Sequence, residues 1–397
     1  MKQLFIKTET QRFWLGKLAA LEGSFKKAAQ KIDEQSQFPL DHINQLRQIG
    51  YTKLTLPKQL GGEGLNVYDS ILLQETLGSY DGSTALAVGW TLLTVGELYE
   101  NQHWESSKLL AFAKEVEKGA MINRAVSEMT TGSPIRGGRP NTSAKREGEH
   151  WILNGRKSYT TGSFALDYFL TSAWVEEKEQ IGFFLISKDN PGVSIEETWD
   201  VMAMRGTASH DLVLHNVLVD QSDLVELLDN SARHKVNGWL LLIPATYLGI
   251  AQAARDCALQ FANTHSPNSI NGTIANLPNV QSLLGEIELE LAKARFTLYG
   301  AAQSYVDYKA NEKEGDSLKE EKIISLINAI NVAKHVVTNG AIQVVDKAMR
   351  VVGAKSLQRT NPLQRYYRDV RAGLHNPPMD DITIKKLAEA ALYEPKG

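Results

Sequence analysis

Cysteine, long apolar runs and charge of one sign are all scarce in this sequence. Its 397 residues include one cysteine, Cys257, so a disulfide within the chain is excluded. This residue lies in an apolar helical stretch without a partner that would activate a thiolate, and we expect it to be a buried, inert core residue. The longest apolar stretch, Trp239–Ile250, is shorter than the ~18 residues that a membrane span requires, so no span is expected.

Positive and negative charges are nearly balanced. The formal net charge is -3 and the isoelectric point is near 6.3, without long runs of like charge, so nucleic acid is not an expected partner. The N-terminal segment Met1–Trp14 lacks the apolar core and small-residue cleavage site of an export signal, which predicts a cytoplasmic protein. No set of metal ligands is expected.

The residue pattern changes twice along the chain, which predicts an α+β protein of three domains. Residues 1–120 are mostly helical in pattern, with a break at Leu56–Val67, whose glycines and proline exclude continuous helix. Residues 121–231 contain short β-branched and aromatic segments and predict an antiparallel barrel or sandwich, with a type I′ hairpin turn at Asn154-Gly155. The expected strands are Trp151–Leu153, Tyr168–Trp174, Ile181–Ile186 and Leu212–Val219.

Helical periodicity returns in residues 232–397. Apolar residues recur at i, i+3, i+4 and i+7 between Val280 and Leu298, which marks one buried helix face. The segments Asn263–Pro278 and Asn311–Ser317 do not have helical composition and separate the helices. The three or four helices joined by such breaks are expected to pack as a bundle.

Four segments in this order resemble the acyl-CoA dehydrogenase superfamily. The first combines the loop Leu56–Gly64 with the helix Leu73–Thr84, and the second, Ala125–Ser133 (AVSEMTTGS), is similar to the family pattern A-V-T-E-P-x-A-G-S. The third is Trp151–Ser163 (WILNGRKSYTTGS), and the fourth, Met202–Val219, is similar to M-G-x-R-G-T-x-S-x-D-L-x-F-x-D-V-x-V. The resemblance implies the acyl-CoA dehydrogenase fold: a helical N-terminal domain, a central antiparallel β-domain and a C-terminal four-helix bundle, with a bound flavin.

The second and third segments carry the residues that the resemblance places at the flavin. Ser127 would reach the pyrimidine edge and Ser133 the phosphate, since both parts of the flavin are rich in acceptors and need fixed donors. Tyr159 would lie against the flavin, and Thr161 would meet flavin N5. Without the resemblance, the two serines fit an ordinary turn rich in Ser and Thr, and Tyr159 fits a core aromatic.

In the fourth segment, the corner Arg205-Gly206-Thr207 leads into a strand. The resemblance brings Arg205 beside the second and third segments, where it would position substrate or orient the Asp211 carboxylate. A surface salt bridge of Arg205 is the alternative interpretation.

The catalytic base of the dehydrogenases is absent from both places where the family carries it. Acyl-CoA dehydrogenation requires a carboxylate to remove the α-proton of the thioester while flavin N5 takes the β-hydride. A match to the family's Y-E-G-T places Asn376-Pro377 at the Tyr-Glu pair, and the second family position falls on Trp239, so neither side chain can accept the proton. Asp380 and Asp381 are the nearest carboxylates, and they could act only if their loop folds back toward the flavin.

Asn361–Asp369 (NPLQRYYRD), followed by His375, is similar to the pattern N-P-L-Q-R-x-W-R-D…H of the reduced-flavin monooxygenases, a branch of the superfamily that lacks the glutamate. The resemblance makes His375 the candidate catalytic donor near the flavin, although this histidine also fits a cap of the preceding helix. The Arg and Phe that grip the adenine half of FAD in the family would fall near His265 and Asn268, so FMN is the alternative to FAD.

Three hypotheses about function follow. The first is a dehydrogenase that oxidises an acyl-CoA and passes electrons to an electron-transfer flavoprotein. The second is a two-component monooxygenase that receives reduced flavin from a flavin reductase and oxidises a small compound. The third is a non-catalytic flavin- or ligand-binding relative that keeps the scaffold. Under the resemblance we also expect a homotetramer, because the family's flavin site is completed by a neighbouring subunit.

Overall fold

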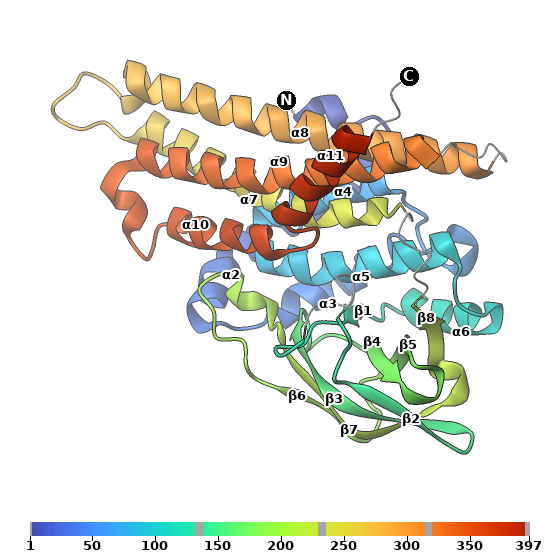
Figure 1. Ribbon diagram of the computed structural model, residues 1–397. Helices are drawn as coiled ribbons and strands as arrows, with labels where there is room; N and C mark the ends of the chain where they lie inside the picture. Colours follow the sequence, from blue (N-terminus) through green and yellow to red (C-terminus); the bar gives the residue numbers. More distant parts are fainter. Residues whose placement is uncertain (1, 132–137, 229–235, 314–319, 394–397) are drawn as a thin grey trace.

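The N-terminal part of the chain is helical. The computed structural model describes residues 2–131, 138–228, 236–313 and 320–393 (Figure 1). The break predicted at Leu56–Val67 is confirmed, because α4 begins only at Val67. The α-helices of this part are α1 (Glu9–Ala19), α2 (Glu22–Gln35), α3 (Leu40–Gln48), α4 (Val67–Tyr80), α5 (Gly82–Asn101) and α6 (Ser106–Glu117).

Helices α4 and α5 form the interior of the molecule. Asp81 lies between them and caps α5, because its carboxylate accepts a hydrogen bond from the Thr84 amide (3.1 Å). Nearly every side chain of both helices is buried, since α4 packs on α7 and α5 packs on both α7 and β1. Such helices are apolar on all faces. Helix α5 therefore links the sheet to the C-terminal helices (Figure 1).

The central part is a mostly antiparallel sheet. Its strand order is β6-β7-β3-β2-β4-β5-β8, with β1 paired to β4, and only the β1–β4 and β2–β4 pairs are parallel. The four predicted strand segments lie in β3, β4, β5 and β7. The strands are β1 (Ile122–Ala125), β2 (Ser143–Glu147), β3 (His150–Thr160), β4 (Tyr168–Val175), β5 (Gln180–Ser187), β6 (Val193–Glu196), β7 (His210–Asp220) and β8 (Leu224–Leu227).

The hairpin turn predicted at Asn154-Gly155 is wrong. Both residues lie inside β3, where the register with β7 shifts between Leu153 and Gly155. Asn154 and Asn216 hydrogen-bond across the two strands, so the Asn side chain stabilises this irregularity rather than a turn. Glycine is required at 155, because a Cβ there would lie 2.4 Å from the Thr142 hydroxyl.

The C-terminal part is again helical. Helices α7, α8 and α9 pack on one another, and α10 packs on α7 and α9. The predicted apolar face of α8 is buried at Val280, Ile287, Leu291, Ala294 and Leu298. Within the described ranges, no helix is long and apolar enough to cross a membrane. The helices are α7 (Leu242–Thr264), α8 (Pro278–Lys313), α9 (Glu320–Val352), α10 (Pro362–Ala372) and α11 (Asp380–Tyr393).

Candidate functional site

The expected flavin-binding segments meet where β3 ends, beside the start of α5. The amide of Gly162 donates to the Thr207 carbonyl (2.8 Å), and the Ser163 hydroxyl donates to the Ala208 carbonyl (2.7 Å). Glycine is needed at 206, since a Cβ there would lie 2.4 Å from Ile32 of α2 and 3.1 Å from Ser83 of α5. The third and fourth segments of the sequence are therefore joined by hydrogen bonds and pressed against the N-terminal helices.

A chain of three hydroxyl groups connects these two segments. Thr161 Oγ1 lies 2.9 Å from Ser209 Oγ, which lies 2.8 Å from Thr207 Oγ1, and Thr207 donates to the Met204 carbonyl (2.9 Å). All three hydroxyl-bearing residues are buried. A carbonyl can only accept, so the donors run from Thr161 through Ser209 to Thr207. This direction leaves a lone pair of the Thr161 oxygen as the part of its hydroxyl that is free to face a ligand.

Tyr159 is held in an unusual position at the end of β3. Its φ of 60° lies in the left-handed region, which is uncommon for an aromatic residue, and 56% of the side chain is exposed. The ring meets Trp199 edge to face, with 6.2 Å between the ring centroids. The interpretation of Tyr159 as a core aromatic is therefore wrong, and the ring offers an apolar face to a ligand.

The loop after β1 is fixed by a buried ion pair that the sequence analysis did not identify. Lys157 Nζ lies 2.7 Å from Glu128 Oε1, and both side chains are almost fully buried. Thr142 donates to the same carboxylate from its amide (3.1 Å) and hydroxyl (2.7 Å). The sequence signal for this pair was a glutamate and a lysine, residue types usually found at the surface, inside the two segments AVSEMTTGS and RKSYTTGS.

Of the two serines predicted to contact the flavin, only Ser127 lies within the described residues. Ser127 is exposed, next to the anchored Glu128, and its carbonyl accepts a hydrogen bond from the Ser158 amide (2.8 Å). Its hydroxyl has no hydrogen-bond partner within the described part of the chain. Ser133 lies outside the described residues.

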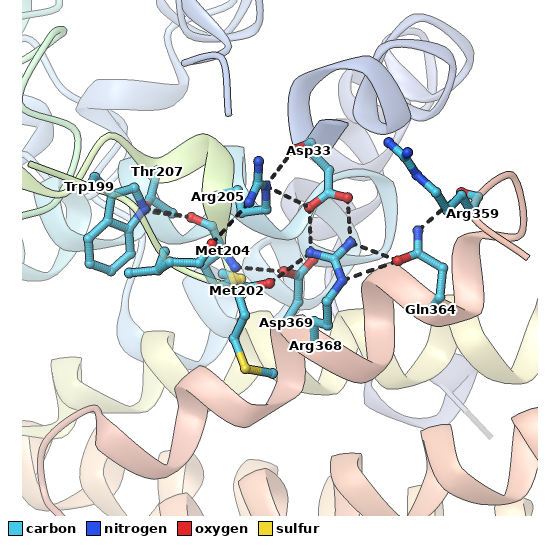
Figure 2. Close-up of polar contacts among 11 residues, drawn as sticks. Asp33, Trp199, Met202, Met204, Arg205, Thr207, Arg359, Gln364, Arg368 and Asp369 are labelled. Atoms are coloured by element: carbon cyan, nitrogen blue, oxygen red, sulfur yellow. Dashed lines mark hydrogen bonds and ion pairs between the residues drawn. The ribbon is translucent and has the colours of Figure 1, made fainter. Parts of the chain in front are cut away.

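Arg205 ties the loop before β7 to α2. Its guanidinium donates to the Asp33 carbonyl (2.8 Å), as Figure 2 shows, and to the Val201 carbonyl (3.2 Å). The expectation that Arg205 orients Asp211 is wrong, because Arg156 donates to that carboxylate at 2.6 Å. The partly exposed guanidinium also forms an ion pair with the Asp33 carboxylate (3.9 Å), which agrees with the alternative interpretation of Arg205 as a salt-bridge residue. Arg205 thus stabilises the loop's position on α2.

Helix α10 grips the same loop through two neighbouring residues. Arg368 forms a two-pronged ion pair with Asp33 (2.9 and 2.5 Å) and donates to the Met202 carbonyl (2.7 Å) (Figure 2). Asp369 accepts from the Met204 amide at 2.6 Å. Burial raises the pKa of Asp369 to about 7, although Arg365 and the Met204 amide both lower it. Loop 199–207 is thus clamped between α2 and α10.

The two positions where the resemblance places a glutamate are Pro377 and Trp239, and neither carries an acid. Asn376, next to Pro377, and Trp239 both have hydrogen-bond partners. The Tyr247 hydroxyl donates to Asn376 Oδ1 at 2.5 Å, and burial raises the pKa of Tyr247, which keeps it a donor. Trp239 Nε1 donates to Glu100 Oε2 at 2.5 Å, and the indole covers Gly96 of α5. Neither a proline nor a tryptophan side chain accepts a proton at neutral pH.

The remaining predicted residues lie in the segment that follows α10. His375 is exposed and has no hydrogen-bond or ion-pair partner in the described ranges, so the alternative of a helix cap is not supported. Asp380 is held on α9 by Lys334 (3.2 Å), His335 (3.1 Å) and Asn339 (2.9 Å). These contacts lower its pKa despite the opposing effect of burial. Asp381 is the second residue of α11.

Comparisons with known proteins identify the class of enzyme that has this architecture. Acyl-CoA dehydrogenase N-terminal, middle and C-terminal domains match residues 9–104, 123–217 and 241–376. The relatives of the chain are flavin-dependent oxidoreductases. YdbM of Bacillus subtilis, named as a putative acyl-CoA dehydrogenase, is 55% identical over 98% of this chain and 99% of its own length. The chain belongs to the acyl-CoA dehydrogenase family.

Solved structures with this fold catalyse different reactions. Butyryl-CoA dehydrogenase from Megasphaera elsdenii matches with a TM-score of 0.84 and 19% identity, over 97% of this chain and 99% of that one. Methanesulfinate monooxygenase MsuC from Pseudomonas fluorescens matches with a TM-score of 0.84 and 22% identity, over 96% and 97%. At these identities the likeness shows the fold alone.

The residues at the end of β3 have the chemistry that a flavin requires. The exposed Tyr159 ring offers an apolar face, Thr161 offers a hydroxyl oxygen, and the anchored loop offers the unpartnered Ser127 hydroxyl. An isoalloxazine combines a flat aromatic surface with a polar edge, so the set fits this family's cofactor. The described ranges contain no group of three or more His, Cys, Asp or Glu side chains that could hold a metal ion.

Proposed function

We propose that the protein is a reduced-flavin-dependent monooxygenase that oxidises a small organic compound. The observation that carries this proposal is that Pro377 and Trp239 stand at the two positions where the resemblance places a glutamate. Trp239 donates to Glu100, and Asn376, next to Pro377, accepts from Tyr247. Thioester dehydrogenation needs a carboxylate base, and the loss of such a base typically costs ~10²–10⁴-fold in rate. Transfer of an oxygen atom from O₂, with electrons from a reduced flavin, does not require a base that removes a proton from a C–H bond.

The flavin, when bound, supplies two electrons to O₂, so that one oxygen atom enters the substrate and the other leaves as water. Thr161 and the exposed Ser127 would hold its polar edge, and Tyr159 would lie on its ring. His375, which has no partner in the described ranges, would donate a proton to the oxygen that leaves. Trp199, edge-on to Tyr159, would limit access of water from that side.

Two further parts of the proposal concern partners. A separate flavin reductase would provide reduced flavin, either FMN or FAD. The protein would form a homotetramer, because Leu289 and Phe296, seven residues apart on α8, are 55% and 57% exposed and form an apolar face that a second copy would cover. A stable monomer in light scattering at micromolar concentration would contradict the assembly.

The binding preference for the two redox states of flavin tests the proposal. We expect the purified chain to bind reduced FMN or FAD more tightly than the oxidised form in anaerobic equilibrium titrations. A monooxygenase of this kind takes up reduced flavin and releases it oxidised, whereas a dehydrogenase retains oxidised flavin. Purification with a stoichiometric amount of tightly bound oxidised FAD would contradict the monooxygenase.

The second candidate is an acyl-CoA dehydrogenase, favoured by the 55% identity to a protein named as one. In this case Asp380 or Asp381 would serve as the base, and electrons would pass to an electron-transfer flavoprotein. Asp380 would first have to leave Lys334 and Asn339. Activity on an acyl-CoA that disappears in the Asp380→Asn, Asp381→Asn double variant would establish this candidate.

A further inference from the structure

A cavity of about 320 Å³ lies between α2, α7 and the start of α10, apart from the residues assigned to the flavin. Its wall includes Lys26 of α2, Cys257 of α7, and Arg359, Arg365 and Tyr366 at α10. The volume is at the lower end of those that hold small ligands. The segment Asn361–Asp369, singled out in the sequence, thus contributes one wall of a cavity.

Arg365 is the unusual member of this wall. Only 7% of the residue is exposed, yet no carboxylate oxygen of a described residue lies within 4.0 Å of its guanidinium. Burial lowers its pKa, but Tyr366 and the carboxylates of Asp81, Asp369 and Asp33, which lie beyond this distance, outweigh burial and raise it. The guanidinium carbon is 5.0 Å from the centroid of the Tyr366 ring. Buried cations are normally paired, because an unpaired buried charge is costly. A ligand that enters the cavity with a negative charge would provide a partner in direct contact.

The other charges on the wall leave an excess of positive charge. Three charged residues of the wall are paired with residues outside the cavity: Asp33 with Arg368 (2.5 Å), Asp256 with Arg255 (3.1 Å) and Lys26 with Glu22 (2.6 Å). The excess positive charge is therefore that of Arg359 and Arg365. Arg359 is exposed and forms no ion pair with a described residue. Figure 2 shows the Arg359 side chain extending from the loop before α10. The backbone carbonyl of Arg359 accepts a hydrogen bond from the Gln364 side chain (3.2 Å).

Helix α10 adds to this positive potential. Asn361 caps it by accepting from the Leu363 amide (3.0 Å), and Pro362 begins it, so its N-terminus points into the same region. The partial positive charge of a helix N-terminus favours an anion within about one turn. Arg365 lies at the end of that first turn.

We propose that this cavity is a binding site for a small oxyanion that carries a phosphate group, with Arg365 and Arg359 as its anchors. A planar guanidinium donates two parallel hydrogen bonds to an oxyanion, which a lysine ammonium cannot reproduce. The Tyr366 ring and the Cys257 side chain would contact the remainder of the ligand.

The single cysteine of the chain provides a readout that is specific to this cavity. Cys257 is half-buried in its wall, which differs from the inert core position expected from the sequence, and burial raises the pKa of its thiol. We would measure the rate of Cys257 alkylation by iodoacetamide, which is uncharged, in the full-length protein. Inorganic phosphate and pyrophosphate would be the probes, against potassium chloride at matched ionic strength.

We expect phosphate or pyrophosphate to slow alkylation saturably in the wild type, roughly tenfold at ~10 times Kd, because only unliganded protein reacts. Arg365→Lys, which keeps the charge but loses the fork, should weaken protection roughly 10- to 100-fold in Kd, as should Arg359→Ala. Arg359 is exposed, so its variant keeps the proposal testable if Arg365→Lys folds poorly. Arg350→Ala, an exposed arginine of α9 outside the cavity, should be protected like the wild type.

Protection that is absent, or equal to that of matched chloride, would overturn the proposal. Equal protection in the wild type, Arg365→Lys and Arg359→Ala would also overturn it, because the anion would then act elsewhere. An effect of phosphate at the flavin site would leave the Cys257 rate unchanged, so the two sites are distinguishable.

Discussion

The indole nitrogen of Trp239 donates a hydrogen bond to one carboxylate oxygen of Glu100 (2.5 Å), while the Tyr305 hydroxyl donates to the other (2.9 Å). Position 239, where the resemblance places a glutamate in some family members, is therefore a packing contact between α5 and the C-terminal helices, and we call this contact a joint. The acid in this joint is Glu100 itself, and both of its oxygens are used. Trp239 thus has a structural role that is incompatible with a base at the same position.

This joint depends on a glycine of α5. A Cβ at Gly96 would lie 2.5 Å from the Trp239 ring, so we expect Gly96→Ala to lower stability by about 1–3 kcal/mol, measured by thermal or chemical denaturation. The matched control is Gly16→Ala in α1, where no atom lies within 4 Å of the added Cβ. There the higher helix propensity of alanine should stabilise by up to ~1 kcal/mol. Equal effects of the two substitutions would contradict the packing of Trp239 on α5.

Thr160 and Thr161 are adjacent and both buried, but of the two hydroxyl groups only that of Thr161 has a hydrogen-bond partner among the described residues. We expect Thr161→Val to weaken flavin binding and to cost about 1 kcal/mol of stability, because it removes the hydrogen bond to Ser209. Thr160→Val should be neutral or stabilising, since the buried Thr160 hydroxyl has no hydrogen-bond partner. Flavin titration and denaturation of both variants measure the difference. The hydroxyl chain would be disproved as a feature of the site if both variants bound flavin like the wild type.

Because α2 and α10 hold loop 199–207 in place, we expect a substitution in these helices to change both the free energy of unfolding and the affinity for flavin. Asp33→Asn removes the charge that pairs with Arg368, and we expect a loss of about 1–3 kcal/mol and weaker flavin binding. The exposed Asp189→Asn serves as the control for loss of one carboxylate. Unchanged flavin affinity in Asp33→Asn would show that the loop keeps its position without the clamp.

Asp369 makes the stability of the clamp depend on pH. Its pKa is raised by burial from 3.8 to about 7, so between these values the folded chain holds a proton that the unfolded chain has released. Its contribution to the free energy of unfolding therefore falls as pH rises through this window. Asp369→Asn keeps an oxygen to accept from Met204 but does not titrate. We expect the melting temperature of the variant relative to the wild type to increase from pH 5 to pH 8, and parallel curves would contradict this.

The sequence predicts this fold better than it predicts the partners of individual side chains. The buried helix face that includes Val280 and Leu298 was predictable, because apolar residues that recur at helical spacing mark the face that is buried. Asn154-Gly155 does not form the predicted turn, because the same pair that favours a tight turn also suits a bulge within a long strand. Local signals identify elements, but they do not distinguish these two uses.

The positions of the candidate site residues relative to one another could be predicted only where they follow from local residue order. Thr161 and Tyr159 lie together at the end of β3 because they are neighbours in the chain. Arg205 was linked to Asp211, six residues away, whereas its real partner is the Asp33 carbonyl, 172 residues away. Asp33 and Arg368, 335 residues apart, meet only because α2 and α10 pack in the folded protein.

The reaction of the protein with acyl-CoA tests the central claim most directly. Under anaerobic conditions, the flavin-loaded protein would be mixed with a panel of straight-chain acyl-CoAs while the absorbance of the oxidised flavin is followed. Because a proline and a tryptophan, Pro377 and Trp239, occupy the two positions where the resemblance places a glutamate, we predict negligible bleaching with every member of the panel. Rapid bleaching by any one of them would contradict the monooxygenase and establish the dehydrogenase.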